Sequence, residues 1–403
     1  MPTRRRFLRA AGAGGLAALA GCQGVGRTGD LDPLAATDLE EFATTQFRGG
    51  LRNQGYVDRS VPESVRVDWS LPVNRGEHTA AKSTPVALPG GDLLVAGDTG
   101  VLRRVGPGGE VRWAATVTEA TRGIHGTPAV ANGVAYVGAY DGVLSAWDLE
   151  DGGRRWRTPL GDAIGSSPVY YNGVCYVAVE FSTPSGSVEA VDAATGETRW
   201  TDSRPTDHPH STVAIDREAG RLVVGANDGV CYAWTFPGLE RAWTFPTEGA
   251  IKGPVATTDG LAVFGSWDGS VYAVDLADGT ERWSFATDAD VMSAPAVADG
   301  TVYVGSHDRS VYALDAADGT EGWTFDAGGW VIGAVTRTRE HVLAGSYDGR
   351  LHAVDAATGE AAWHADGRGR ATSGALVTDD AVYYAERSPD PGDAAGMLYR
   401  LVG

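Results

Sequence analysis

Residues 291–325, VMSAPAVADGTVYVGSHDRSVYALDAADGTEGWTF, contain three short apolar runs separated by turn signals and a final run that carries a tryptophan. The runs are rich in Val, Tyr and Ala, and Asp-Gly pairs or the polar SHDR segment separate them. Runs of this length between such turns predict strands joined by tight hairpins. The stretch therefore predicts a small antiparallel sheet of four strands, whose faces need neighbours to cover them.

The tryptophan of this stretch recurs along the chain at intervals of 44, 43, 44, 43, 40, 40 and 40 residues: Trp69, Trp113, Trp156, Trp200, Trp243, Trp283, Trp323 and Trp363. A period near 40 with about four strands per unit is typical of propeller blades, whereas helical arrays show a 3.6-residue periodicity. The predicted fold is all-β, an eight-bladed β-propeller of four-stranded antiparallel blades.

The two ends of the chain complement one another. No full blade precedes Trp69, and after Trp363 only three strand candidates remain before Gly403. The segment VRVDWSLPV, residues 65–73, supplies the missing fourth strand. We therefore expect the N- and C-terminal strands to pair and close the ring, which removes the exposed edges of an open array.

Residues 1–22 have the character of an export signal. Residues 3–9, TRRRFLR, match the twin-arginine pattern, and a short apolar stretch follows and ends in LAGC. This lipobox-like ending predicts acylation of Cys22, a twin-arginine export route and a lipoprotein on the outer face of the cytoplasmic membrane. Cleavage near Ala20 without a lipid is the alternative. Residues 23–45 predict a flexible tether, and residues 46–403 the propeller, with 46–64 leading into its first paired strand.

The composition is strongly acidic, with a net charge of −19, and Lys82 and Lys252 are the two lysines among 33 basic residues. Such a surface is typical of exported halophilic proteins and excludes nucleic acid as a partner, since nucleic acid requires a basic face. Besides Cys22, the chain has Cys175 and Cys231, which we predict to be buried thiols; a disulfide between them stays open. No zinc-site spacing of Cys and His occurs, so no metal site is predicted.

The repeats resemble a known family. The segment AVDAATGETRW, residues 190–200, resembles the tryptophan-docking motif of pyrroloquinoline-quinone-type (PQQ-type) propeller repeats, and similar copies end at Trp283, Trp323 and Trp363. This family includes quinoprotein dehydrogenases and BamB-like lipoproteins. The resemblance implies that the motif Asp closes its own turn, the Gly supplies a positive φ and the Trp packs between blades.

Ten aspartates therefore have a predicted structural role, and none has the spacing of a calcium loop. Five belong to the docking motif and five to the second hairpin of a blade: Asp148, Asp192, Asp275, Asp315, Asp355, and Asp141, Asp228, Asp268, Asp308, Asp348.

Aligning the blades on their turns places one residue of each blade at the lip of the central channel: Lys82, His125, Gly165, His210, Lys252, Met292, Ile332 and Thr372. A crescent of lysine and histidine inside an acidic shell predicts an anion-binding site. The alternative is that the lysines pair with nearby acids or line a water-filled hole. The hairpin tips around the same mouth form a candidate surface for a partner or a flat ligand: Tyr140, Asn227, Trp267, His307 and Tyr347. Single exposed aromatic residues are also ordinary.

The resemblance leaves the activity open. Quinoprotein dehydrogenases carry adjacent cysteines, an acidic calcium cage and a catalytic Asp, and this chain has no Cys-Cys pair. We therefore assign no catalytic residue and no cofactor, with PQQ and calcium kept as weak candidates. The favoured function is a non-catalytic, monomeric binding or assembly scaffold for a protein partner or a small anion. The alternatives are a PQQ-dependent sugar or alcohol oxidoreductase and a solute sensor.

Overall fold

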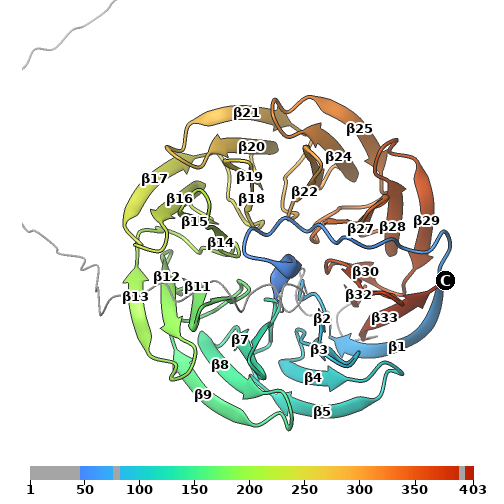
Figure 1. Cartoon of the computed structure of the whole chain (residues 1–403), viewed down its shortest axis with the longest axis horizontal. Helices are drawn as coiled ribbons and strands as arrows, with labels where there is room; N and C mark the ends of the chain where they lie inside the picture. Colours follow the sequence, from blue (N-terminus) through green and yellow to red (C-terminus); the bar gives the residue numbers. More distant parts are fainter. Residues whose placement is uncertain (1–45, 76–81, 390–394) are drawn as a thin grey trace, which may run out of the picture.

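The computed structural model describes residues 46–75, 82–389 and 395–403, and these form a ring of eight sheets around a central axis (Figure 1). The predicted signal segment with Cys22, and the predicted tether at residues 23–45, lie outside the described residues. Seven sheets have four antiparallel strands, and the eighth is built from five strand segments because two short ones pair with β32. The prediction of an eight-bladed propeller is confirmed.

The first four blades follow the chain from β2 to β17. Blade 1 contains β2 (Val86–Ala87), β3 (Leu93–Val95), β4 (Val101–Val105) and β5 (Val111–Thr116); blade 2 contains β6 (Ala129–Ala131), β7 (Val134–Gly138), β8 (Val143–Asp148) and β9 (Arg154–Pro159); blade 3 contains β10 (Val169–Tyr171), β11 (Val174–Glu180), β12 (Gly186–Asp192) and β13 (Thr198–Asp202); blade 4 contains β14 (Ala214–Asp216), β15 (Arg221–Gly225), β16 (Val230–Thr235) and β17 (Arg241–Pro246).

The last four blades continue to the C-terminus. Blade 5 contains β18 (Ala256–Thr258), β19 (Leu261–Gly265), β20 (Ser270–Asp275) and β21 (Glu281–Ala286); blade 6 contains β22 (Ala296–Ala298), β23 (Thr301–Gly305), β24 (Ser310–Asp315) and β25 (Glu321–Asp326); blade 7 contains β26 (Thr336–Arg337), β27 (His341–Gly345), β28 (Arg350–Asp355) and β29 (Ala361–Asp366); blade 8 contains β30 (Arg370–Ala371), β31 (Leu376–Val377), β32 (Val382–Arg387), β33 (Gly396–Val402) and, from the N-terminal side, β1 (Arg66–Asn74).

The core lies between neighbouring blades. The second strand of a blade is buried on both faces, as in β7, whereas the outermost strand alternates between exposed and partly buried residues, as in β9. One core cluster joins Trp283 and Val263 of blade 5 to Val302, Val304 and Leu314 of blade 6. Each sheet therefore covers the face that its neighbour leaves open, as the repeat predicted.

The motif tryptophans lock adjacent blades together. The indole Nε1 of Trp283 donates to the carbonyl oxygen of Ala316 in the next blade at 2.9 Å, and Trp323 makes the same contact with Ala356 at 3.0 Å. A Cβ on Gly319, which has φ +75°, would lie 2.7 Å from the Trp283 ring, so only glycine fits beneath the indole.

The aspartates of the motif and of the second hairpin close their own turns, as the family resemblance implied. The Asp315 carboxylate accepts from the amide of Ala317 at 2.8 Å, and the Asp308 carboxylate accepts from the amide of Ser310 at 2.8 Å. The equivalent contact occurs at each of the other predicted positions: Asp141, Asp148, Asp192, Asp228, Asp268, Asp275, Asp348 and Asp355.

Trp200 departs from this pattern, because the docking turn of blade 4 is replaced by residues 236–239 with a cis Phe236-Pro237 bond. Its Nε1 has no hydrogen-bond partner among the described residues, and its ring packs edge-on against Trp234 at 5.9 Å. Both side chains are similarly buried, so Trp283→Phe and Trp200→Phe remove similar ring volumes. Comparing the two variants therefore isolates the contribution of the indole hydrogen bond to stability.

We expect Trp283→Phe to cost about 1–2 kcal/mol more unfolding free energy than Trp200→Phe, because it leaves the Ala316 carbonyl without its donor. Chemical denaturation of the two variants measures this difference. Equal losses would mean that the indole hydrogen bond contributes nothing to blade docking.

Strands β1 and β33 close the ring. They pair antiparallel from Arg66↔Val402 to Asn74↔Gly396, and Figure 1 shows the blue N-terminal strand beside the red C-terminal one. The indole of Trp363 donates to the carbonyl of Pro62 at 2.8 Å, so the last tryptophan docks on the N-terminal segment. The predicted closure by the two chain ends is confirmed.

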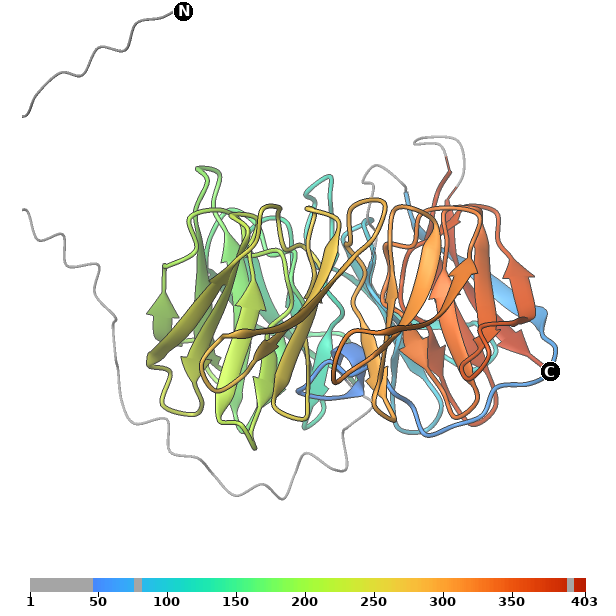
Figure 2. The same ribbon diagram turned by 90° about the horizontal axis from the view of Figure 1, so that it is seen from above.

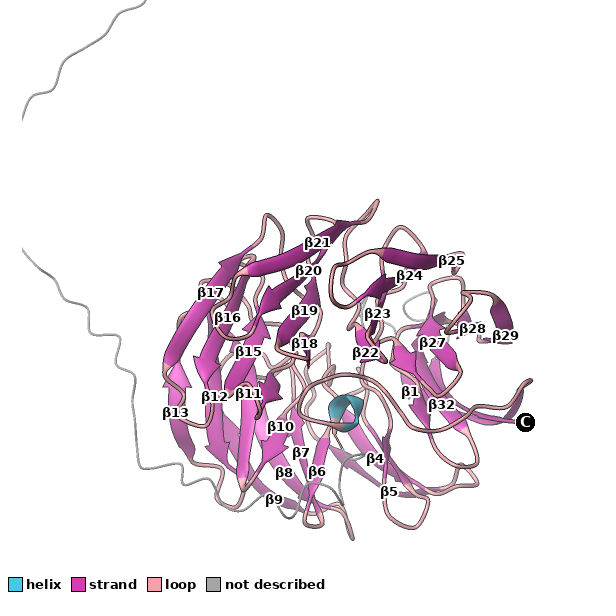
Figure 3. Ribbon diagram, turned by 45° about the horizontal axis from the view of Figure 1, so that its top comes forward, coloured by secondary structure: helices cyan, strands magenta, loops and turns pink. Residues whose placement is uncertain are grey.

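Residues 46–62, which we call the N-terminal strap, do more than lead into β1. A single 3₁₀ turn (Phe47–Gly49) lies at the centre of the ring (Figure 3), and the strap runs along one face of the disc (Figure 2). Carbonyl oxygens of the strap accept from amides in β14, β18, β22 and β26: Leu51 from Ile215 at 2.8 Å, Arg52 from Thr257 at 2.9 Å, Gln54 from Val297 at 2.7 Å and Gly55 from Arg337 at 2.8 Å.

Buried polar side chains fasten the strap to the ring. The Arg48 guanidinium donates to the carbonyls of Ala294 and Pro295 at 3.1 and 2.8 Å, and the Asn53 amide donates to those of Val213 and Val255 at 3.0 Å each. Because these partners belong to blades 4 to 6, the strap joins blades that are distant from it in the sequence.

Cys175 and Cys231 are both buried, as predicted, and both are free, so the disulfide that the sequence left open is not formed. Burial raises the pKa of each thiol far above its ordinary value, so both stay protonated and unreactive. No helix among the described residues is long and apolar enough to cross a membrane.

Candidate functional site

A cavity of about 480 Å³ occupies the mouth of the channel on the side away from the strap, and a smaller chamber of about 30 Å³ lies deeper along the axis. Phe47 of the strap lines the deeper chamber together with seven of the eight predicted lip residues. The strap therefore turns the channel into a pocket that opens at one end.

In five blades, one backbone hydrogen bond holds together the two loops that form the wall of the pocket. In each case the amide of a hairpin-tip residue donates, at 2.9–3.0 Å, to the carbonyl of the residue two positions before the lip residue of the same blade: Tyr140 to Gly123, Asn227 to His208, Trp267 to Ala250, His307 to Asp290 and Tyr347 to Trp330. These bonds hold the tip of the second hairpin of a blade against the segment that enters its innermost strand. Side chains from both loops therefore line the same mouth of the channel.

The structure brings most of the predicted site residues together. Lys82, His125, Gly165, His210, Lys252, Met292 and Ile332 line the deeper chamber, and all five hairpin-tip residues line the outer cavity. Thr372 is the exception: it is fully buried and lines neither space. The backbone amide of Thr372 lies 3.4 Å from the carbonyl oxygen of Ala385 in β32. That these residues bind a ligand stays a prediction.

Neither lysine of the chain forms an ion pair with a described carboxylate. The Lys252 ammonium instead lies 3.3 Å from the centroid of the Trp267 ring, a cation–π contact. Burial lowers the pKa of Lys252, although Asp207, Asp290 and Glu180 oppose the shift. Burial, together with the charge of Lys252, lowers the pKa of Lys82 to about 7. The pocket thus contains two amines that form no direct ion pair with a described carboxylate, although three acids act on Lys252 from a distance.

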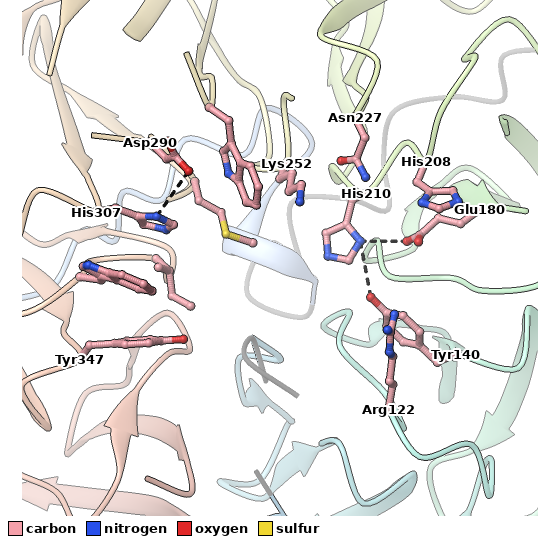
Figure 4. A pocket seen from close by; sticks show the side chains of 14 residues that line it. Arg122, Tyr140, Glu180, His208, His210, Asn227, Lys252, Asp290, His307 and Tyr347 are labelled. Carbon is pink, nitrogen blue, oxygen red and sulfur yellow. Dashed lines mark hydrogen bonds and ion pairs between the residues drawn. The ribbon is translucent and has the colours of Figure 1, made fainter. Parts of the chain in front are cut away.

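A histidine–carboxylate pair forms one side of the pocket. His210 Nδ1 lies 2.9 Å from Glu180 Oε1 and 3.5 Å from the hydroxyl of Tyr140 (Figure 4). Burial would raise the pKa of Glu180, but the neighbouring His210 outweighs it and holds this pKa below its ordinary value. The ring of His125 packs 4.4 Å from that of Tyr140. This side therefore offers the imidazole of His210, held in place by a buried carboxylate, beside that of His125, which packs on Tyr140.

The opposite side is an aromatic wall made by His307, Trp330 and Tyr347. The rings of His307 and Trp330 stack at 4.8 Å and 12°, and those of Trp330 and Tyr347 at 5.5 Å and 29°. Figure 4 shows His307 and Tyr347 across the pocket from His210, with Lys252 between the two sides. Trp330 is 49% exposed, so part of the wall is accessible from the mouth.

The buried polar atoms that have no hydrogen-bond partner among the described residues include Asn227 Oδ1, Trp267 Nε1 and His307 Nε2. All three residues line the outer cavity. Buried polar groups are normally paired, by protein or by ordered water. Their clustering here indicates a place where bound water or a ligand supplies the missing partners.

The lip alignment missed five residues that also line the cavity: Arg122, Glu180, His208, Asp290 and Trp330. Three of them occupy the position two residues before a lip residue, since His208, Asp290 and Trp330 precede His210, Met292 and Ile332. Extending the same alignment by two positions identifies them. Glu180 belongs to the insertion at 180–187, and its side chain reaches the pocket through its contact with His210.

The residues of the pocket do not match the quinone site implied by the dehydrogenase branch of the family. No group of three or more His, Cys, Asp or Glu side chains suited to hold a metal ion occurs in residues 46–75, 82–389 and 395–403. The two thiols of these ranges, Cys175 and Cys231, are single, buried and in different blades. We therefore derive no step through a quinone or a calcium ion.

Comparison with solved structures shows the same fold. A quinohemoprotein alcohol dehydrogenase from Comamonas testosteroni matches with a TM-score of 0.73 and 14% identity, over 90% of this chain and 82% of the other. BamB from Moraxella catarrhalis matches with a TM-score of 0.66 and 16% identity, over 84% of this chain and 100% of the other. A europium-containing methanol dehydrogenase matches with a TM-score of 0.72 and 13% identity, over 91% of this chain and 100% of the other.

Comparison at the level of sequence is more specific. Outer membrane protein assembly factor BamB from Moranella endobia (strain PCIT) is 25% identical over 188 residues, which are 45% of each protein, so the chain spans less than half the length of this relative. The family model described as outer membrane protein assembly factor BamB matches residues 98–233 and 268–395, more than half of the chain. Together with the tryptophan-docked, eight-bladed ring, this match shows that the chain belongs to the BamB family of PQQ-type β-propellers.

Proposed function

We propose that this protein is a non-catalytic binding scaffold, exported and held at the membrane by a lipid on Cys22, and that its channel mouth binds a small anion or an anionic group of a protein partner. The observation that carries the proposal is the position of the two lysines. In a chain of net charge −19 both line one pocket, and no described carboxylate pairs with either. A cation left unpaired in a pocket that opens at one end favours an anionic occupant.

The form of the pocket supports a binding role. The strap shuts the far end, and the backbone bonds between tips and links hold the mouth residues on a rigid ring. Side chains held in this way lose little conformational entropy when a ligand binds, which raises affinity. The aromatic wall adds apolar area beside the two lysines, which suits a ligand that carries both an anionic group and an apolar part.

Isothermal titration calorimetry with citrate and with inorganic phosphate, in concentrated KCl, tests the anion site. We expect the substitutions Lys82→Ala and Lys252→Ala together to weaken binding by about a hundredfold, since each charge-assisted contact contributes roughly 1.5 kcal/mol or more. The matched control is Arg155→Ala with Arg282→Ala, which removes two cations from exposed ion pairs on the outer strands.

Unchanged affinity in the lysine variant would overturn the anion site. Affinity capture from native membranes in high salt distinguishes the two sources of the anion. A protein partner that the parent retains and the lysine variant loses assigns the anionic group to that protein. Binding of the free anions alone assigns the site to a small ligand.

Export and anchoring have a test of their own. We expect Cys22→Ser to release the protein from the membrane into the medium, because the acyl-accepting thiol is lost, and Arg4→Lys with Arg5→Lys to retain it inside the cell. Fractionation of cells followed by immunoblotting measures both effects. Membrane association that persists in Cys22→Ser would contradict the lipid anchor.

A further inference from the structure

We propose that Lys82 is a reactive amine that forms an imine with small aldehydes or oxo acids bearing an anionic group, and that Lys252 holds this group beside it. The inference rests on the proposed anion site and adds to it a covalent step at one lysine.

The first support is the placement of the two amines. Lys82 lies directly before blade 1 and Lys252 directly before blade 5, yet both line the deeper chamber, which Phe47 of the strap bounds on the far side. Lys82 forms no ion pair or hydrogen bond with a described residue. An ammonium group in such a place lacks the carboxylate that normally keeps a buried lysine charged, so its free-base form is favoured.

The second support is the set of groups that face this amine. From the links before β18, β6 and β14 come Lys252, His125 and His210, all of which line the same chamber. Beyond them His307, Glu180 and Asp290 line the outer cavity. The acids pair with histidines instead, since Glu180 contacts His210 at 2.9 Å and Asp290 lies 3.9 Å from His307. The chamber that Lys82 lines is shared with a second lysine, Lys252, and no carboxylate of the described residues lines it.

The electrostatic balance agrees with this geometry. Burial and the neighbouring Lys252 lower the pKa of Lys82 to about 7. Burial also lowers the pKa of Lys252, but Asp207, Asp290 and Glu180 oppose the shift there. At pH 7 about half of the Lys82 side chains are then neutral, against roughly one in a thousand for an ordinary lysine. Lysines that act as nucleophiles toward carbonyl groups are activated by desolvation or by an adjacent cation.

The proposed step balances without an oxidant or reductant. The neutral Nζ of Lys82 attacks the carbonyl carbon and forms a C–N bond, and the carbonyl oxygen takes a proton to give a carbinolamine. The C–O bond then breaks, the oxygen leaves as water with both protons of the former amine, and a C=N bond remains. His125 and His210, which line the same chamber, are suited to carry these protons.

Reductive trapping tests the proposal on the full chain. The protein is incubated with glyoxylate and sodium cyanoborohydride, which reduces an imine to a stable secondary amine, and labelled peptides are mapped by mass spectrometry. With two lysines in the chain, the map distinguishes Lys82, Lys252 and the N-terminal amine without ambiguity. We expect the label on Lys82 at pH 7 to form at least about tenfold faster than on Lys252.

The pH dependence of labelling and the labelling of variants distinguish a specific reaction at Lys82 from the labelling of any accessible amine. Labelling of Lys82 is expected to rise with pH around a midpoint near 7. Lys252→Met is expected to move this midpoint upward, because the repelling charge is gone. It is also expected to remove the preference for glyoxylate over uncharged acetaldehyde. Lys82→Arg, which keeps a cation in place, is expected to abolish the label while the thermal melt stays that of the parent.

Equal labelling of both lysines, or a Lys82 midpoint near that of an ordinary lysine, would overturn the imine proposal. Its failure is distinguishable from failure of the proposed function. If calorimetry shows phosphate or citrate binding that depends on both lysines while glyoxylate leaves Lys82 unlabelled, the anion site stands and the covalent step is wrong.

Discussion

We expect a chain that lacks residues 372–403 to be unable to form the closed propeller, because these residues complete blade 8. The truncation removes β31, β32 and β33, and with them the partner to which β1 pairs from Arg66 to Asn74. It also removes the side chains of blade 8 that cover Trp363, including Tyr384, Tyr399 and Leu401. Blades 7 and 1 would then each expose an apolar face, and a propeller with a missing sector has two open edges.

We expect the truncated protein to show no cooperative melt, or a melt lowered by tens of degrees, with binding of an apolar dye. Circular dichroism during heating measures this. The control is removal of the exposed Gly403 alone, which is expected to melt like the parent. A truncated protein with the parent's melt would show that the blades do not depend on closure.

The second large effect is expected from deletion of the N-terminal strap. Removal of residues 1–59 eliminates four strap carbonyls that accept from inner-strand amides and the buried donors of Arg48 and Asn53. These are eight hydrogen bonds: four to the strap carbonyls, two from Arg48 and two from Asn53. At roughly 1 kcal/mol for each, the loss is about 8 kcal/mol, which lowers the melting temperature by about 10 °C for a protein of this size. The deletion stops before Pro62, so Trp363 keeps its acceptor.

The same deletion is expected to weaken the anion site, because Phe47 no longer bounds the chamber beneath Lys82 and Lys252 and water enters from the far side. The matched control is deletion of residues 1–45, which leaves the described part of the strap intact and is expected to change neither melting nor binding. Differential scanning calorimetry and citrate titration of the two proteins measure both effects. Identical behaviour of the two deletions would mean that the strap is dispensable.

The sequence repeat predicted both the number of blades and most of the residues that line the pocket. The recurring tryptophans predicted the number of blades, because most of them dock on the turn of the following blade, as Trp69 does on Pro107 and Trp283 on Ala316. Within the described part of the chain Trp200 lacks this hydrogen bond, and Trp363 docks on Pro62 of the N-terminal segment. The repeat also placed Lys82, Lys252, His125 and His210 at one mouth, since equivalent positions of equivalent blades must lie at the same height around the axis.

The sequence by itself therefore determined the blade count, the closure by β1 and β33 and the ring of lip residues, because all three follow from a local pattern repeated at a constant interval. Only the tertiary structure decided that the strap closes the channel, that Thr372 is buried away from the pocket, and that neither lysine forms an ion pair with a carboxylate in the described part of the chain. The physical reason is that the strap uses its backbone and two polar side chains to bind carbonyls and amides of distant blades. Such bonds require no repeating side-chain pattern and leave no periodic signal in the sequence.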